Sequence, residues 1–280
     1  MPIPINDKYV VPEHVVNFLC DGERSFLALR LVHGLLNALD TAVKGNMSLV
    51  PSLFSKEHSI RTSTLAAAVG PEKAKDNRWM HLACAELAAQ NILSKPRIER
   101  RVFLFSLGAK FSEAFSNKTR AFAVMNTEQV RQCRTIHDLM FLSLACLHGG
   151  KDRPRFLLPR IPVRLEPKAP SLPLLPQKPL EQDPWRSPWC QSSRSWVNAA
   201  IRTSEILDHA YLLAPRQDMV DDYVSEVAVK IQTTKTKWER GTLYKFPPGT
   251  RSVIQIPMGG NKTTLNADAL RHKWHQTIIQ

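Results

Sequence analysis

The chain has 280 residues, of which 43% are apolar, and it carries 38 basic against 25 acidic side chains, a formal net charge of +13. This length and composition predict a folded protein with room for two domains, and the charge favours nucleic acid as a partner. No apolar run reaches the roughly 18–20 residues that a membrane span needs, so we expect neither a membrane-spanning segment nor a membrane partner.

Two long helices are predicted in the first half of the chain. Apolar residues recur closely between Phe26 and Leu39, which predicts a mostly buried helix over about 23–44. A second long helix is predicted over about 72–91, with Trp79 among the residues that set its faces.

A short alanine-rich helix is predicted between these two. Thr62 or Ser63 is expected to cap its start, and Gly70 is expected to end it in a left-handed conformation. In a helix-turn-helix the two helices cross so closely that the first carries a small residue at the contact. Ala66 would be that residue, with Leu65 packing into the core.

The residues after the second long helix have the pattern of a wing. Apolar residues at 92–93 and 102–105 flank a basic, proline-containing turn, which predicts a strand, a loop and a strand. This order favours a winged helix-turn-helix, and the alternative is an ordinary helical hairpin in a core. In the first case the long helix would enter a DNA major groove and the wing would contact the backbone or the minor groove. The candidate contact residues are Lys73, Lys75, Asn77 and Arg78 on the helix and Lys95, Arg97, Arg100 and Arg101 on the wing.

Prolines divide the chain into an N-terminal domain, 1–150, and a C-terminal domain, 191–280. Ten of the 20 prolines lie between Pro154 and Pro188. Because proline lacks a backbone donor, we expect residues 151–190 to form an extended linker or strap rather than a helix or a central strand. Its leucines and tryptophans predict that the strap docks on a protein partner or on a second copy of the chain.

The C-terminal domain is expected to be smaller and to combine helices with a β-hairpin. Helices are predicted near 194–213 and 216–232, and the hairpin strands at 242–246 and 252–256. These elements would suit a second winged helix. Basic residues interleaved with aromatic ones would equally suit a platform for single strands or RNA, or would surround a core tryptophan. The candidate contact residues are Lys235, Lys237, Arg240, Lys245 and Arg251.

The predicted fold class is therefore α+β and mainly helical. It comprises a winged helix-turn-helix domain, an extended proline-rich strap and a smaller domain of helices and a hairpin. The sequence between residues 25 and 148 places an apolar helix, a short helix ending at Gly70, a long helix and the strand 102–105 in this order. In this order it resembles the first winged-helix domain of bacterial plasmid replication initiators of the paired winged-helix (Rep) type.

Patterns for catalysis or metal binding are incomplete. Asp218, Asp222 and Glu226 would share one helical face, and Cys133 stands four residues before His137, but neither set completes a metal site. The five cysteines include no CxxC pair and are expected to be reduced thiols. Phosphate-binding glycine loops and nucleophile motifs are missing from the sequence, so we expect a non-enzymatic protein without cofactor or metal. The start of the chain lacks the pattern of a secretory leader, and we expect a cytoplasmic protein.

These patterns predict a nucleic-acid-binding protein. The resemblance implies sequence-specific binding of double-stranded DNA in plasmid-type DNA replication initiation. The alternative is an RNA-binding or structural subunit of a multi-subunit ribonucleoprotein effector complex. The strap favours this alternative, because an extended, partly apolar proline segment needs a partner surface.

Overall fold

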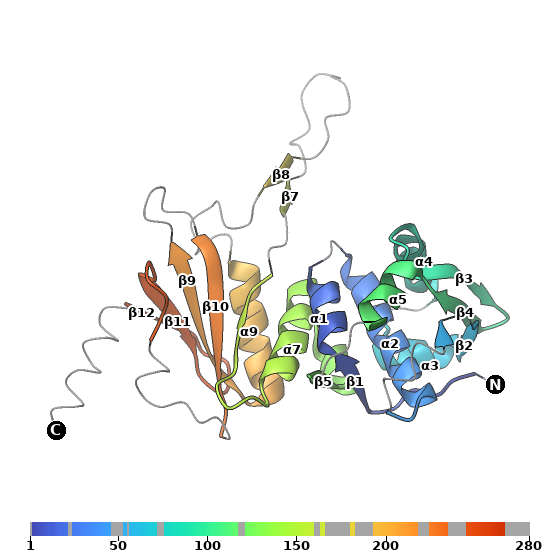
Figure 1. Cartoon of the computed structure of the whole chain (residues 1–280), viewed down its shortest axis with the longest axis horizontal. Coiled ribbons are helices and arrows are strands. Elements are labelled where there is room, and N and C mark those ends of the chain that lie inside the picture. The colour runs from blue at the N-terminus through green and yellow to red at the C-terminus, as the bar shows by residue number, and fades with distance from the viewer. Residues whose placement is uncertain are drawn as a thin grey trace, which may run out of the picture. The chain divides into compact units, whose positions relative to one another are not determined.

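The computed structural model describes residues 2–21, 24–45, 53–54, 56–71, 76–116, 121–159, 163–165, 180–182, 193–217, 224–234 and 245–266. The chain divides into two compact units, Met1–Gly150 and Lys151–Gln280 (Figure 1). Within the described ranges, no helix combines the length and the apolar character that crossing a membrane requires.

The first unit is built around helix α2 (Phe26–Ala42), which occupies most of the range in which a buried helix was expected. All thirteen residues from Ala28 to Asp40 are buried, so other elements cover this helix on every side. One of these, β1, pairs antiparallel with β5 and places Lys8 opposite Asn126. The further elements of this part are β1 (Lys8–Pro12), α1 (Glu13–Cys20), α5 (Ala109–Ser116), β5 (Phe122–Asn126), α6 (Thr127–Gln132) and α7 (Ile136–His148).

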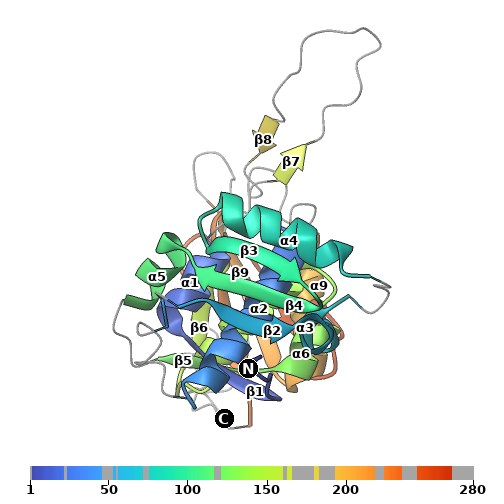
Figure 2. The same ribbon diagram turned by 90° about the vertical axis from the view of Figure 1, so that its right-hand side faces the viewer.

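A three-stranded antiparallel sheet and two helices form the rest of the first unit. The sheet order is β2-β4-β3, and α4 lies along β3 (Figure 2). Alternate residues of β4 are buried, and the rings of Phe103 and Phe105 stack at 5.4 Å, so one face of the sheet belongs to the core. The elements are β2 (His58–Arg61), α3 (Thr62–Val69), α4 (Arg78–Ala89), β3 (Leu93–Glu99) and β4 (Val102–Leu107).

Two sequence-based expectations for the short helix α3 are wrong. Neither Thr62 nor Ser63 caps it, because the N-cap is Arg61, which makes no side-chain cap hydrogen bond. Gly70 is not left-handed but extended, with φ −65° and ψ 152°. The ring of Pro71 explains this, because a residue that precedes proline is restricted to extended backbone.

The small residue at the close helix crossing belongs to α2 rather than to α3. A Cβ atom on Gly34 would lie 2.6 Å from Leu65 Cδ1 and 2.8 Å from Val69 Cγ2. Leu65 is buried as expected, whereas Ala66, which was assigned to the contact, is only half-buried. The glycine therefore allows α3 to approach α2, and the alanine has no comparable role.

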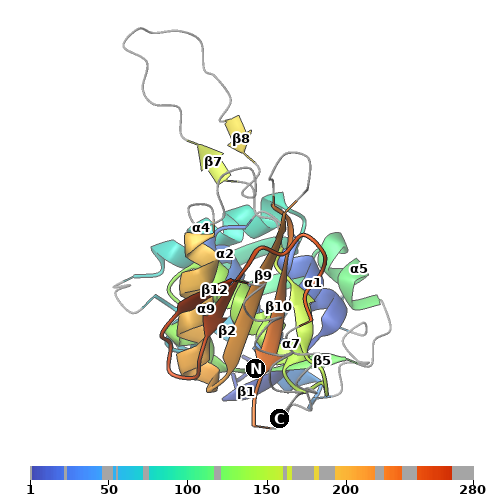
Figure 3. The same cartoon turned by 90° about the vertical axis from the view of Figure 1, so that its left-hand side faces the viewer.

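The main described elements of the second unit are a five-stranded sheet and one long helix. The sheet order is β12-β11-β9-β10-β6, and all of its pairs are antiparallel (Figure 3). Helix α9 buries Trp196, Val197, Ala199 and Ala200. The elements are β6 (Arg155–Leu157), α9 (Arg194–Leu207), β9 (Ala210–Gln217), β10 (Val224–Gln232), β11 (Ser252–Ile256) and β12 (Thr263–Asn266).

The predicted mainly helical fold class is wrong, because the structure is α+β and its described residues form twelve strands beside eight helices. The second unit accounts for the error, since the range predicted as a helix over 216–232 contains the strand β10. Apolar residues recur there at a helical spacing, but several are β-branched, and these favour a pleated sheet. Of the predicted hairpin, the second strand forms β11, which pairs with β9 and β12, while residues 242–244 of the first strand lie outside the described residues.

Parts of the proline-rich strap are described. Residues Arg155–Leu157 form β6, which lies at the edge of the described sheet and pairs with β10. Such an edge position tolerates flanking prolines, because the outer row of backbone groups needs no partner strand. Further along the strap, β7 (Val163–Leu165) and β8 (Leu180–Gln182) pair antiparallel with each other.

Candidate nucleic-acid interface

The hairpin between β3 and β4 ends in a turn made of two arginines. Glu99 pairs with Val102 across the hairpin, so Arg100 and Arg101 alone form the connection. Both have a positive φ, 46° and 68°, and both are exposed. Two-residue hairpin turns of this kind favour Asn-Gly, because other residues are strained at positive φ. Arginine at both positions is therefore conformationally costly, on the order of 1 kcal/mol per residue.

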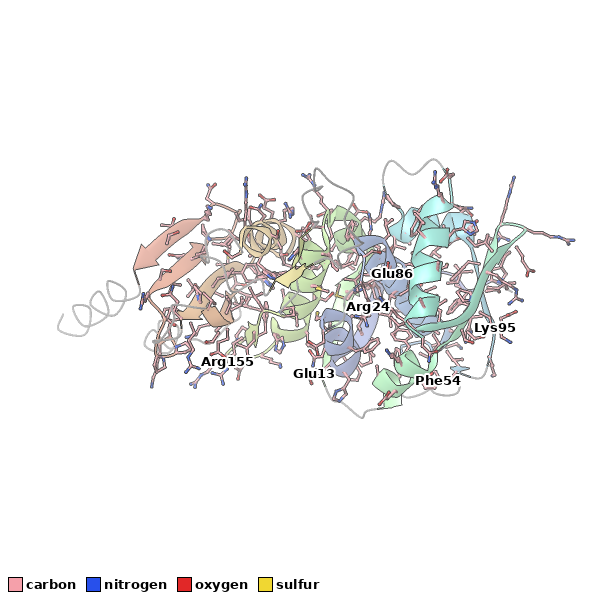
Figure 4. The ribbon with its side chains drawn as sticks, turned by 90° about the horizontal axis from the view of Figure 1, so that it is seen from above. Glu13, Arg24, Phe54, Glu86, Lys95 and Arg155 are labelled. Carbon is pink, nitrogen blue, oxygen red and sulfur yellow. The ribbon has the colours of Figure 1, made fainter. Side chains whose placement is uncertain are left out.

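A second strained basic residue lies in the same hairpin. Lys95 has φ 48° and is exposed, and the strand register shifts between Ser94 and Arg97 (Figure 4). Such a bulge changes the direction of a side chain relative to the regular pleat. Three exposed basic side chains are thus presented by unfavourable backbone conformations in one hairpin, a pattern that accompanies functional sites.

Arg97 has a different environment from the other basic residues of the hairpin. Its Nη1 and Nη2 atoms donate to the two carboxylate oxygens of Glu57, and its Nε atom donates to Glu99 Oε1 at 2.6 Å. These hydrogen bonds raise the pKa of Arg97 and lower the pKa of Glu57. The charge of Arg97 is therefore shared with two carboxylates, and Arg97 links β3 to the residues before β2.

The tip of the hairpin is held by the first residue of α3. Both the backbone N and Oγ1 of Thr62 donate hydrogen bonds to the carbonyl O of Arg101, at 3.0 and 3.1 Å. Thr62 is buried, so the donor side of these hydrogen bonds is shielded from water, whereas Arg101 is exposed. The sequence predicts only a capping role for Thr62, because its hydrogen-bond partner is 39 residues away along the chain.

Helix α4 lies beside the hairpin and has one exposed face. Asn77 is its N-cap residue and Arg78 its first residue, with the Arg78 backbone N donating to Asp76 Oδ1 at 2.9 Å. Arg78 is exposed, and Leu82, one helical turn further along, is 59% exposed. This face carries one positive charge close to the start of the helix. Lys73 and Lys75, the other helix residues predicted to contact DNA, lie outside the described residues.

The opposite face of α4 is fixed to the body of the first unit. Trp79, Met80 and Leu87 are buried. Glu86, which follows Leu82 by one turn at the border of the buried face, accepts at Oε1 a hydrogen bond of 2.6 Å from the backbone N of Ser25 (Figure 4). Ser25 is next to Arg24, whose guanidinium lies 4.5 Å from the Phe18 ring centre. The helix is therefore positioned with its other face toward solvent.

In the second unit, two of the five candidate contact residues are described. Lys245 and Arg251 are exposed, whereas Lys235, Lys237 and Arg240 lie outside the described residues. The carbonyl O of Lys245 accepts a hydrogen bond of 2.6 Å from Lys230 Nζ. Lys230 is buried, and it precedes the five candidates in the same basic run of the sequence.

The described residues cover the two incomplete metal patterns only in part. Glu226 lies on strand β10 rather than on a helix, while Asp218 and Asp222 lie outside the described residues. Cys133 follows the end of α6 in extended conformation, and His137 belongs to α7. Among the described residues, no group of three or more His, Cys, Asp or Glu side chains is placed to hold a metal ion.

Comparison with known proteins finds no family model and no curated protein that matches this chain.

Proposed function

We propose that the first unit binds double-stranded DNA, with α4 in the major groove and the β3–β4 hairpin as a wing on the adjacent backbone. We further propose that this binding is sequence-specific and serves replication initiation of the plasmid type. The Arg100–Arg101 turn carries the proposal, because its strained backbone presents two cations to solvent.

The order of elements supports this proposal. The elements α2, β2, α3, α4, β3 and β4 follow one another, and the strands associate in the order β2-β4-β3. A helix-turn-helix with a wing requires two helices followed by a hairpin that reaches beyond them. Helix α4 and the hairpin are adjacent, so one duplex can contact both.

The positions of the charges support different proposed roles for the contact residues. Arg100, Arg101 and Lys95 are exposed on the hairpin and are suited to phosphate contacts, which supply affinity without reading sequence. Arg78, at the start of α4, is placed to reach base edges, where an arginine can read guanine through two hydrogen bonds. Arg97 contributes less, because two carboxylates already share its charge.

The decisive variant is Arg100→Asn combined with Arg101→Gly. Asn-Gly is the preferred sequence for this turn, so the double variant is expected to stabilise the hairpin by about 1 kcal/mol while removing two cations. Its affinity for a mixed-sequence duplex should fall at least about tenfold, and the dependence of log affinity on log salt should decrease by about two. Fluorescence anisotropy across a salt titration measures both quantities. A loss of binding in a more stable protein separates function from folding.

The matched control is Lys44→Asn combined with Lys110→Gln. It also removes two exposed charges from the first unit, and Lys44 has a positive φ of 52° outside the hairpin. Its affinity and salt dependence should remain those of the wild type. If the control loses as much affinity as the turn variant, or the turn variant loses none, the proposed interface is wrong.

Two further measurements test the kind of nucleic acid and the reading of sequence. The first is competition for the bound duplex between unlabelled duplex and single-stranded RNA. If the RNA displaces the bound duplex at a concentration equal to or lower than that of the unlabelled duplex, the proposal is contradicted and the RNA-binding alternative is favoured. Selection from a random duplex library should yield a defined motif for the wild type. Arg78→Ala should relax that motif at one position, whereas Arg100→Ala should weaken binding to all duplexes alike.

A further inference from the structure

The second unit has a pocket on the side of its sheet that does not form the core. Along β10, Val227, Val229 and Ile231 are fully buried. Because side chains alternate along a strand, Ala228 and Lys230 point to the opposite face. Lys230 and Ala228 line a cavity of about 930 Å³ on that face.

Two cations are placed side by side at the base of this pocket. Arg155 on β6 is the direct cross-strand partner of Lys230 on β10, so both side chains project from the same face of the sheet. In Figure 4, Arg155 lies on the other side of the strands from α9. Like charges directly opposite each other destabilise a sheet. An arrangement of this kind gains stability when an anion binds between the two charges.

The electrostatic state of Lys230 agrees with this placement. Its side chain is only 7% exposed, and burial together with the neighbouring charge of Arg155 lowers the pKa of Lys230 to about 8. The ammonium group therefore remains mostly protonated near neutral pH, but in surroundings that penalise its charge. An anionic ligand would relieve this penalty, because an opposite charge favours the protonated form.

A short, well-anchored segment closes the other side of the pocket. Lys230 Nζ donates to the carbonyl O of Lys245 and lies 4.8 Å from the centre of the Phe246 ring. Beyond it, Thr250 Oγ1 donates to the carbonyl O of Pro247 at 2.9 Å. Gly249 has φ +86°, and a Cβ there would lie 2.6 Å from the carbonyl O of Gln217. These constraints hold the segment over the sheet before any ligand arrives.

The pocket combines positive charge with apolar surface. Four basic residues and one acidic residue are among its lining, and the acidic one, Glu226, lies 3.5 Å from Arg216 in an ion pair. Leu157, which is 55% exposed, and Pro248 add apolar surface. The volume lies in the range of small-molecule sites, which is roughly 300–1,000 Å³, and exceeds what an isolated phosphate would fill. The basic residues are Arg153, Arg155, Lys230 and Lys245.

We propose that this pocket binds a nucleotide, whose phosphate lies between Arg155 and Lys230 and whose base packs against Leu157 and Pro248. The nucleotide is either a free mononucleotide or one residue of a single-stranded nucleic acid. This site is independent of the duplex-binding function proposed for the first unit, because all of its lining residues belong to the second unit.

Calorimetric titration of the full chain tests the proposal with four probes: inorganic phosphate, adenosine monophosphate, uridine monophosphate and a single-stranded oligonucleotide without base pairing. We expect saturable binding of at least one nucleotide probe, at least about tenfold tighter than that of phosphate. Tightest binding by a mononucleotide identifies a free nucleotide as the ligand, and tightest binding by the oligonucleotide identifies a single strand. Equal binding of phosphate and all nucleotides, or no saturable binding, overturns the proposal.

Three variants connect the binding to the pocket. Arg155→Gln changes an exposed edge-strand residue and should weaken nucleotide binding at least about tenfold while the protein remains folded. Lys230→Met should also abolish binding, and wild-type affinity should fall as pH rises through about 8. Arg194→Gln removes the same charge from the exposed start of α9 and should leave binding unchanged. Loss of binding in Arg194→Gln equal to that in Arg155→Gln would overturn the proposal.

The same measurements distinguish failure here from failure of the proposed function. The Arg100→Asn, Arg101→Gly variant should bind the nucleotide as the wild type does, while Arg155→Gln should bind duplex DNA as the wild type does. Loss of nucleotide binding in the turn variant would show that the pocket does not hold the nucleotide.

Discussion

The two units present their positive charge in different ways. In the first, Arg100 and Arg101 stand on an exposed turn whose backbone is strained. In the second, Lys230 is buried in a pocket beside Arg155. An exposed turn can follow a long polyanion, whereas a pocket admits only a compact anion. The same residue types therefore serve different ligands, and backbone geometry rather than composition makes the distinction.

The largest expected difference between the units is in how their folding stability responds to acid. His33 is fully enclosed in the first unit, and burial lowers its pKa from 6.5 to about 3. Ser143 Oγ donates to the carbonyl O of Leu139, so it accepts from His33 Nε2, and His33 Nδ1 accepts from Tyr9 OH at 2.8 Å. The neutral ring satisfies all of these hydrogen bonds, and a second proton would disrupt them.

The unfolded chain binds a proton at His33 below about pH 6.5 that the folded first unit excludes, so stability falls as pH decreases from about 6.5 toward 3. The loss should be on the order of 3 kcal/mol near pH 4, and hydrogen exchange of α2 and α7 amides measures it. His33→Gln, which does not titrate, should flatten this dependence. An unchanged pH dependence in the variant would show that His33 is not its source.

The folding stability of the second unit should instead change at alkaline pH. The pKa of Lys230 is about 8 in the folded state against 10.5 in the unfolded chain. Between these values the unfolded state binds more protons, so the stability of the second unit should rise as pH increases from about 8 to 10.5. The two pKa values of Lys230 are closer together than those of His33, so the change in stability should be smaller. Hydrogen exchange of β9 and β10 amides measures it.

Lys230→Met should remove this rise and make the second unit more stable at neutral pH, because the buried charge beside Arg155 is gone. Arg194→Gln should keep the rise, since it lies outside the pocket. A rise that persists in Lys230→Met would have to come from another group.

A larger side chain at Gly34 should destabilise the first unit alone, because it disturbs packing within that unit. The side chain in Gly34→Val would overlap Leu65 and Val69, and the first unit should lose about 2 kcal/mol of stability. Gly150→Val is the matched control, because a Cβ there meets nothing within 4 Å. Urea unfolding, monitored by hydrogen exchange, should show that Gly34→Val destabilises the first unit and leaves the second unit unchanged. Equal effects of the two substitutions would mean that the α2–α3 crossing tolerates a larger side chain.

The units also differ in how well their sequences predict their structures. Helix α2 was predicted because its apolar residues are dense and contiguous, and the hairpin because a basic segment separates two apolar ones. Strand β10 was missed because Val227 and Ile231 also match a helical spacing, and only pairing with β9 and β6 decides between helix and strand. That pairing involves residues distant in the sequence, so local pattern cannot indicate it.

The candidate site of the first unit could also be predicted from the sequence, whereas that of the second unit could not. Basic residues on the hairpin were recognisable as a cluster, because they are close together in the sequence. The pocket was not, because its basic residues come from separate segments: Arg155 and Lys230 lie on neighbouring strands, and Lys245 lies in the segment before β11. The strain at Arg100 and Arg101 was also unpredictable, since it depends on the strand register that leaves only two residues for the turn.

The smallest predicted effect concerns the support of the wing tip. Thr62→Val keeps the shape of the side chain and the backbone hydrogen bond but removes the hydrogen bond from Oγ1 to the carbonyl O of Arg101. The expected cost is about 1 kcal/mol, seen as faster hydrogen exchange at the start of β4. Duplex affinity should fall only slightly, because both arginines remain. Thr62→Ser keeps the hydroxyl and should exchange as the wild type does. If Thr62→Val leaves exchange at the tip unchanged, the backbone hydrogen bond alone holds the wing, and the strain at Arg100 and Arg101 is sustained by the hairpin itself.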